Sequence, residues 1–270
     1  MRRLALACCC AAACSSAGGG PSSDVPPAPR TIRYVPDSVT YHLTGHRQLE
    51  QEFQGQATRQ ELRLRVWFRS MLAPGMTDTM AARLVLDSVA ESGGGSAPGD
   101  LAAMRGATWT GRLTPGGELL DLAGPTDAGL ANQMFNTLRE FYPRLPAAGV
   151  LAGDAWVDTV TSDVDVGGVQ LTIRAVHDHD AIGLQPWDAG EAFLIRVTTA
   201  YTIAGEGSES GQPLTLNGTG RRHTQEYLSP TGRYLGNVVA DTSTYEVVLT
   251  ALGMSIPGRQ WRYDTVRVAR

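Results

Sequence analysis

Side chains that could bind a metal are concentrated in one short stretch, His177-Asp-His-Asp180, with Asp188 and Glu191 following it in the chain. In an extended backbone, residues two apart point to the same side, so His177 and His179 would share one face. Two imidazoles and one carboxylate can hold a divalent metal. The stretch therefore gives one hypothesis, a metal-dependent enzyme, which requires a third ligand to converge on the pair. The alternative is a solvated His/Asp segment between strands.

The sequence lacks the other common catalytic signatures. All 23 basic residues are arginine, so no lysine is available for a phosphate-binding loop, a Schiff base or a Ser-Lys dyad. There is no Gly-x-Ser-x-Gly motif, and neither His42 nor His223 has a local partner that suggests a triad. We therefore predict that the protein is not an enzyme and uses no cofactor.

The charge balance argues against a nucleic-acid partner. The chain has 27 acidic and 23 basic residues, a formal net charge of −4, and no basic cluster. Proteins that bind nucleic acid usually carry a basic patch that neutralises phosphates. We predict no nucleic-acid binding.

The first residues have the pattern of an export signal. Arg2-Arg3 is a short positive region, Leu4 to Ala13 is apolar and rich in small residues, and Cys14 follows. The segment resembles the bacterial lipoprotein signal, in which the cysteine after the cleaved residues 1–13 is acylated. All four cysteines lie within or at the end of this segment, so a mature chain would keep only Cys14 and could form no internal disulfide. The alternative is a soluble secreted protein that is cleaved nearby.

The next residues, 14–30, are rich in Gly, Ser and Pro and are typical of a tether. Acyl chains on Cys14 would anchor this tether in a membrane. Ser15 stands where some bacterial lipoproteins carry the Asp that retains them in the inner membrane. We therefore expect a lipid-anchored protein of the bacterial cell envelope, on the periplasmic face of the outer membrane, with its folded domain at 31–270.

One amphipathic helix is predicted over 126–142. Leu130, Met134, Leu138 and Phe141 fall on one stripe of such a helix, and Pro143 prevents its continuation. That apolar face requires a sheet to cover it.

Both flanks of this helix read as β-strands. Apolar residues alternate with polar ones over 39–43, 61–69, 169–175 and 193–203. Residues 80–90 are predicted as another strand, with a helix as the alternative. We predict a mainly β (α+β) fold: a long, curved antiparallel sheet or half-barrel packed on the one central helix.

Two similar hairpins bracket the helix, at 107–120 and 224–235, and both have a Pro-containing turn that ends in Gly. They suggest a single domain made of two related halves, 31–125 and 150–270. The alternative is that hairpins of this kind look alike by coincidence.

The phrase Phe141-Tyr-Pro-Arg-Leu-Pro, followed by Gly153-Asp-Ala-Trp156, resembles a family of uncharacterised bacterial lipoproteins that share an FPxLP…GDxW phrase. This resemblance implies no activity. The order of anchor, tether, curved sheet and helix is also similar to the periplasmic lipoprotein-carrier half-barrels. That second similarity implies acyl-chain binding on the concave face of the sheet.

These observations favour a non-enzymatic envelope protein that binds an apolar ligand, such as a lipid, or a partner protein. The side chains expected to line its binding surface are Leu62, Leu64, Leu138, Phe141, Phe193, Ile195 and Tyr201. The alternative is a structural or assembly module whose interior is filled by its own side chains.

Overall fold

The computed structural model describes residues 31–269, except 76–77, 94–97, 127–128, 167, 189 and 210. The expected signal at 1–13, Cys14 and the tether at 14–30 therefore lie outside the described residues. None of the described helices is long and apolar enough to span a membrane.

The fold is mainly β, as predicted: the described residues form one open antiparallel sheet of eleven strands in the order β5-β4-β3-β2-β1-β11-β10-β9-β8-β7-β6. The first and last strands of the chain thus lie side by side near the middle of the sheet. The strands are β1 (Asp37–Phe53), β2 (Gln56–Pro74), β3 (Met80–Ser92), β4 (Thr108–Leu113), β5 (Leu119–Ala123), β6 (Ala155–Val166), β7 (Val169–Trp187), β8 (Gly190–Glu209), β9 (Gln212–Leu228), β10 (Tyr234–Leu249) and β11 (Met254–Val268).

Several strands are longer than the sequence suggested. The polar stretch 46–60 is nearly all strand, because the turn within it needs only Gln54 and Gly55, both with positive φ. Strand β2 also continues to Pro74, five residues beyond the alternating stretch 61–69. Residues 80–90 form a strand rather than a helix. Polar side chains do not interrupt these strands because one face of the sheet is exposed to solvent.

The predicted central helix is present as α2 (Gly129–Arg139) and is shorter than 126–142. Its apolar stripe is confirmed at Met134 and Leu138, which are buried, and Phe141 is buried just beyond the end of the helix. Two further short helices, α1 (Pro98–Ala103) and the 3₁₀ turn η1 (Thr250–Leu252), were not predicted.

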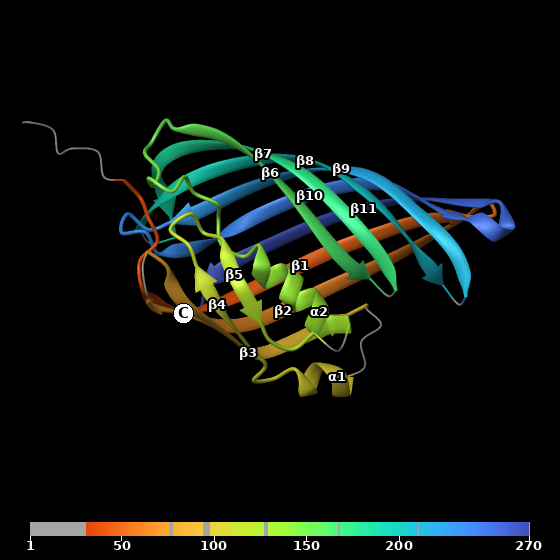
Figure 1. Cartoon of the computed structure of the whole chain (residues 1–270), viewed down its shortest axis with the longest axis horizontal. Coiled ribbons are helices and arrows are strands. Elements are labelled where there is room, and N and C mark those ends of the chain that lie inside the picture. The colour runs from red at the N-terminus through yellow and green to blue at the C-terminus, as the bar shows by residue number, and fades with distance from the viewer. Residues whose placement is uncertain are drawn as a thin grey trace, which may run out of the picture.

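The sheet curves around α2, which lies within its concave side (Figure 1). The main hydrophobic core joins α2 and the segment after it to one end of the long strands, which we call the core end. Phe141 is at its centre: its ring contacts the rings of Phe68, Tyr41 and Tyr234 edge-on, with centroid separations of 4.9, 5.1 and 5.1 Å.

The opposite end of the long strands, which we call the far end, carries the hairpin turns β1–β2, β6–β7, β8–β9 and β10–β11. In Figure 1 these turns extend well beyond α2. The two ends therefore present different environments on the same concave face.

Candidate functional site

A row of polar side chains crosses the concave face between the two ends. Residues paired in register on neighbouring antiparallel strands project from the same face. One continuous line of register pairs runs from β6 to β1, and we call it the charged row: Asp158, His177, Thr199, Arg222, Asp241, Arg262 and Arg47. The charged row projects toward α2. Ile195 and Leu43 lie four residues from Thr199 and Arg47 on the same strands, so they project from the same face, and both belong to the main core.

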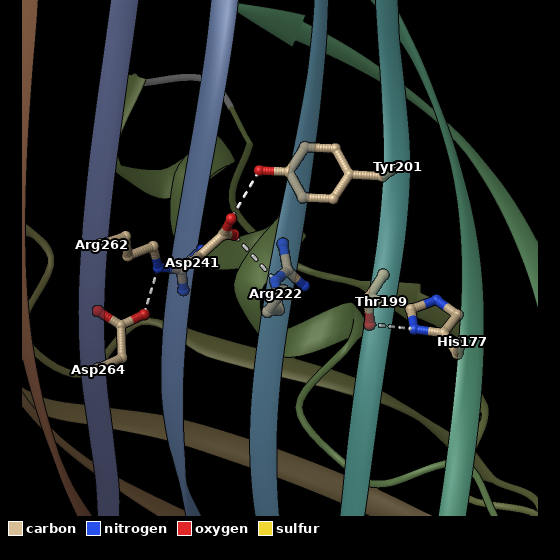
Figure 2. Close-up of polar contacts among 7 residues, drawn as sticks. All are labelled: His177, Thr199, Tyr201, Arg222, Asp241, Arg262 and Asp264. Atoms are coloured by element: carbon tan, nitrogen blue, oxygen red, sulfur yellow. Dashed lines mark hydrogen bonds and ion pairs between the residues drawn. The ribbon is translucent and has the colours of Figure 1, made fainter.

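Asp241 is the best-connected member of the charged row. Arg222 Nε donates to Asp241 Oδ2 at 2.9 Å, and the Tyr201 hydroxyl donates to Asp241 Oδ1 at 2.7 Å (Figure 2). Burial disfavours the charge on Arg222, but the Asp241 carboxylate outweighs it and raises the pKa of Arg222. Burial, followed by the Asp241 contact, raises the pKa of Tyr201 to about 12. The result is an ion pair with both carboxylate oxygens occupied.

Arg262 pairs in the same way with Asp264, two residues along β11 (Figure 2). Gly45 faces Asp264 across the β1–β11 pair, and a Cβ at Gly45 would lie 2.9 Å from Asp264 Oδ1. The absence of a side chain at Gly45 therefore leaves room for the carboxylate.

The two histidines of the sequence-based metal hypothesis do share the concave face. His177 Nδ1 forms a hydrogen bond with Thr199 Oγ1 at 2.9 Å, and His179 Nε2 lies 3.4 Å from Asp158 Oδ1. Burial is the main cause that lowers the pKa of both imidazoles, so we expect both to be neutral at pH 7. The His179 ring also stacks on Trp156 at 4.6 Å.

A third ligand for this pair is not apparent. Asp188, one of the two acidic residues that follow the histidines in the chain, lies 3.4 Å from Arg267, a residue of β11. Within the described part of the chain, no group of three or more His, Cys, Asp or Glu side chains could hold a metal ion. Metal binding at His177 and His179 stays a prediction.

Beyond the charged row, the concave face becomes apolar again. Its side chains at the far end of β7 to β11 are almost all half-buried, and none belongs to either hydrophobic cluster. We call this surface the far apolar face: Val169, Leu171, Ile173, Ile203, Leu214, Leu216, Tyr245, Val247, Leu249, Met254 and Ile256.

Two glycines shape this part of the concave face. A Cβ at Gly220 would lie 2.2 Å from the Tyr201 ring, and one at Gly258 would lie 2.3 Å from the Tyr245 ring. Each tyrosine ring therefore lies across a glycine on the neighbouring strand, which keeps the rings flat against the sheet.

Shallow open depressions also occur at the far end, but mainly among side chains of the convex face. Two of them have volumes of about 460 and 520 Å³ and are lined mostly by short polar side chains such as Thr172, Thr202 and Asn217. Their lining also includes Glu206 in the first depression and Glu246 in the second, and the second reaches Ile203 and Tyr245 of the far apolar face.

The expected lining residues divide into two groups. Leu138, Phe141, Phe193 and Ile195 are at most 5% exposed and are packed in the core. Leu62, Leu64 and Tyr201 are half-buried on the concave face nearer the charged row. Contact of either group with a ligand stays a prediction.

Comparisons with known proteins assign the chain to no family. No family model matches the chain, and no curated protein matches it significantly. Among solved structures, it is similar to the crystal structure of Pseudomonas aeruginosa OccK2 (OpdF), with 10% identity over 87% of this chain and 98% of that one and a TM-score of 0.32. OccK2 in complex with glucuronate gives 9% identity, 87% and 99% coverage and a TM-score of 0.31. Scores this low support no conclusion about this chain.

Sequence reasoning missed the arginines and aspartates of the charged row. A signal for them exists in hindsight: Arg222 and Asp241 occupy positions whose alternation with exposed neighbours places them on the inward side of their strands. A charged residue at an inward position is unusual, because burial of a charge is costly unless it is paired.

Proposed function

We propose that the protein is a lipid-anchored component of the bacterial cell envelope that binds an apolar ligand along the far apolar face. The observation that carries this proposal is an apolar concave surface at the far end that lies outside the hydrophobic core. There the concave side chains are apolar and lie outside both hydrophobic clusters, while their neighbours on the convex side, such as Thr172, Asn217 and Glu246, are polar and exposed. An extended apolar surface of this kind on a folded protein usually marks a binding site.

The free energy gained when a ligand covers the far apolar face is sufficient for binding. Full burial of one Val, Leu or Ile side chain stabilises a complex by about 1.5–3 kcal/mol, and these side chains still expose only part of their surface. Covering the exposed parts of the eleven would contribute roughly 5 kcal/mol, which corresponds to dissociation constants of order 100 μM from this surface alone. A polar contact at one end of the ligand would tighten binding further.

The envelope location is supported by the N-terminal sequence: a short positive and apolar segment ending at Cys14, then a Gly/Ser/Pro-rich tether. Acylation would hold the described domain close to a membrane, which is a source of apolar ligands.

The test uses the full chain with Cys14→Ser, purified and delipidated, and a neutral pyrene-labelled alkane whose fluorescence reports binding. We expect saturable binding that the double variant Ile203→Thr/Val247→Thr weakens at least fivefold, because hydroxyl groups replace methyl groups on the far apolar face. The matched control is Ala204→Thr/Val248→Thr, at the next positions of the same strands on the convex face. Its affinity should equal that of the parent chain.

Failure of the parent chain to bind the alkane would support the alternative of a structural module. Equal loss of affinity in both double variants would show that the ligand does not bind specifically on the concave face.

A further inference from the structure

Near β1, the inward face of the sheet carries one more arginine than aspartate. On β9, β10, β11 and β1, the inward side chains include three arginines, Arg222, Arg262 and Arg47, and two aspartates, Asp241 and Asp264. Each aspartate is already paired with a different arginine. Arg47 is half-buried and forms no hydrogen bond or ion pair with any described residue.

The neighbours of Arg47 make this position unfavourable without an anion. Arg262 is its direct register partner on β11, and like charges directly opposite each other in a sheet are destabilising. Burial and then Arg262 lower the pKa of Arg47, while Asp264 and Asp241 act in the opposite direction from their own ion pairs. Of the other carboxyl groups of this face, Asp158 and Glu140 interact with His177, and Glu140 also interacts with Arg222. Glu226 lies on the same face of β9, four residues from Arg222 toward the core end.

Arg47 also lies where the charged row meets apolar surface. Its other register partner is Leu62 on β2, and the next inward residue on its own strand is Leu49; both are half-buried. From Arg47 to Phe53, at the end of β1, the strand continues for six residues, or roughly 20 Å at about 3.4 Å per residue. One acyl chain spans about half of a bilayer core roughly 30 Å thick, so the concave face is long enough to hold it lengthwise.

We propose that the ligand is a single-chain anionic amphiphile of the fatty-acid type, whose carboxylate binds Arg47 and whose chain lies along the far apolar face. This assignment rests on the proposed function and adds the chemical class of the ligand. A guanidinium matches a carboxylate through two parallel N–H···O bonds, and such charge-assisted bonds are stronger than neutral ones. The headgroup would also separate the charges of Arg47 and Arg262.

The experiment compares dodecanoate with dodecanol, two ligands with the same chain and different headgroups. Binding of each to the full chain with Cys14→Ser is measured by displacement of the pyrene-labelled alkane. We expect dodecanoate to bind at least tenfold more tightly than dodecanol, and Arg47→Gln to remove that preference while dodecanol affinity stays unchanged. Arg221→Gln, on the exposed opposite face of β9, is the matched control and should keep the preference.

The outcomes separate the two proposals. If neither compound displaces the alkane, or the alkane does not bind, the proposed function is wrong. If both bind equally to the parent chain, or the preference survives in Arg47→Gln, the carboxylate assignment is wrong and the apolar site stands. A salt titration of the parent chain gives a check that needs no variant: a preference for dodecanoate that does not shrink as ionic strength rises would also overturn the assignment.

Discussion

The two ends of strand β8 show how differently one face of one sheet can be used. At the core end, Ile195 and Val197 point inward and are 0% and 4% exposed. At the far end, Ile203 points inward by the same alternation, is only half-buried and lies outside the core cluster. The strand, the face and the kind of side chain are alike, so the difference lies in what covers them.

The lengths of the elements explain the difference. Helix α2 has 11 residues and is therefore roughly 16 Å long at 1.5 Å per residue. Strand β8 has 20 residues and extends for roughly 65 Å at about 3.3 Å per residue. A helix this short covers only a fraction of the length of the strands. The far apolar face is the part of the inward pattern that α2 does not reach.

The largest effect is expected when one apolar side chain is truncated to alanine at each end of the sheet. Phe141→Ala should lower the free energy of unfolding by about 4 kcal/mol, because it opens a cavity at the centre of the aromatic core. Ile203→Ala should lower it by only about 1 kcal/mol, because the side chain is already partly exposed. Urea unfolding followed by circular dichroism measures both. Similar losses at the two positions would show that the far end is as well packed as the core.

The second prediction concerns the boundary between the ends. Asp241→Ala leaves Arg222 half-buried without its carboxylate and should cost about 3 kcal/mol of unfolding free energy. The double variant Arg222→Met/Asp241→Leu removes both charges and should recover most of that loss, because no unpaired charge remains. The same urea titration measures the set. A double variant as unstable as Asp241→Ala would mean that the aspartate stabilises the fold through Tyr201 instead.

Much of this architecture could be predicted from the sequence, because alternation of apolar residues is a local signal. The strands at 61–69, 169–175 and 193–203 and the stripe of α2 are all confirmed. The ends of the strands were less predictable. Residues 46–60 are mostly polar, and their strand conformation depends on pairing within the β1–β2 hairpin and, for 46–51, on pairing with β11.

The charged row could not be predicted as a unit for the same reason. Its members come from seven strands, and only the register of the sheet brings Arg47 opposite Arg262 or His177 opposite Thr199. The β7–β8 hairpin sets its register through its own turn, but nothing local in the sequence specifies the register between β1 and β11. The His177/His179 motif was visible because both residues lie on one strand, and it led to the metal hypothesis while the arginines of the same row were overlooked.

The smallest expected effect concerns Glu226, four residues from Arg222 on β9 and on its core side. Burial, followed by repulsion from Asp158, raises the pKa of Glu226 from 4.5 to about 8. Below pH 4.5 the carboxyl is neutral in both the folded and the unfolded chain, so its titration does not change the free energy of unfolding. Between pH 4.5 and 8 only the unfolded chain releases the proton, so the free energy of unfolding falls by up to about 1.4 kcal/mol per pH unit.

Glu226→Gln removes this titration and keeps the shape of the neutral acid. We therefore expect the variant to gain stability over the parent chain as pH rises from 5 to 8, by roughly 2 kcal/mol in total, because part of the side chain keeps access to solvent. The measurement is the difference in unfolding free energy between the two chains at several pH values. A difference that does not change with pH would show that Glu226 is ionised in the folded protein. The core end would then admit water as the far end does, and the contrast between the two ends would be weaker than their packing indicates.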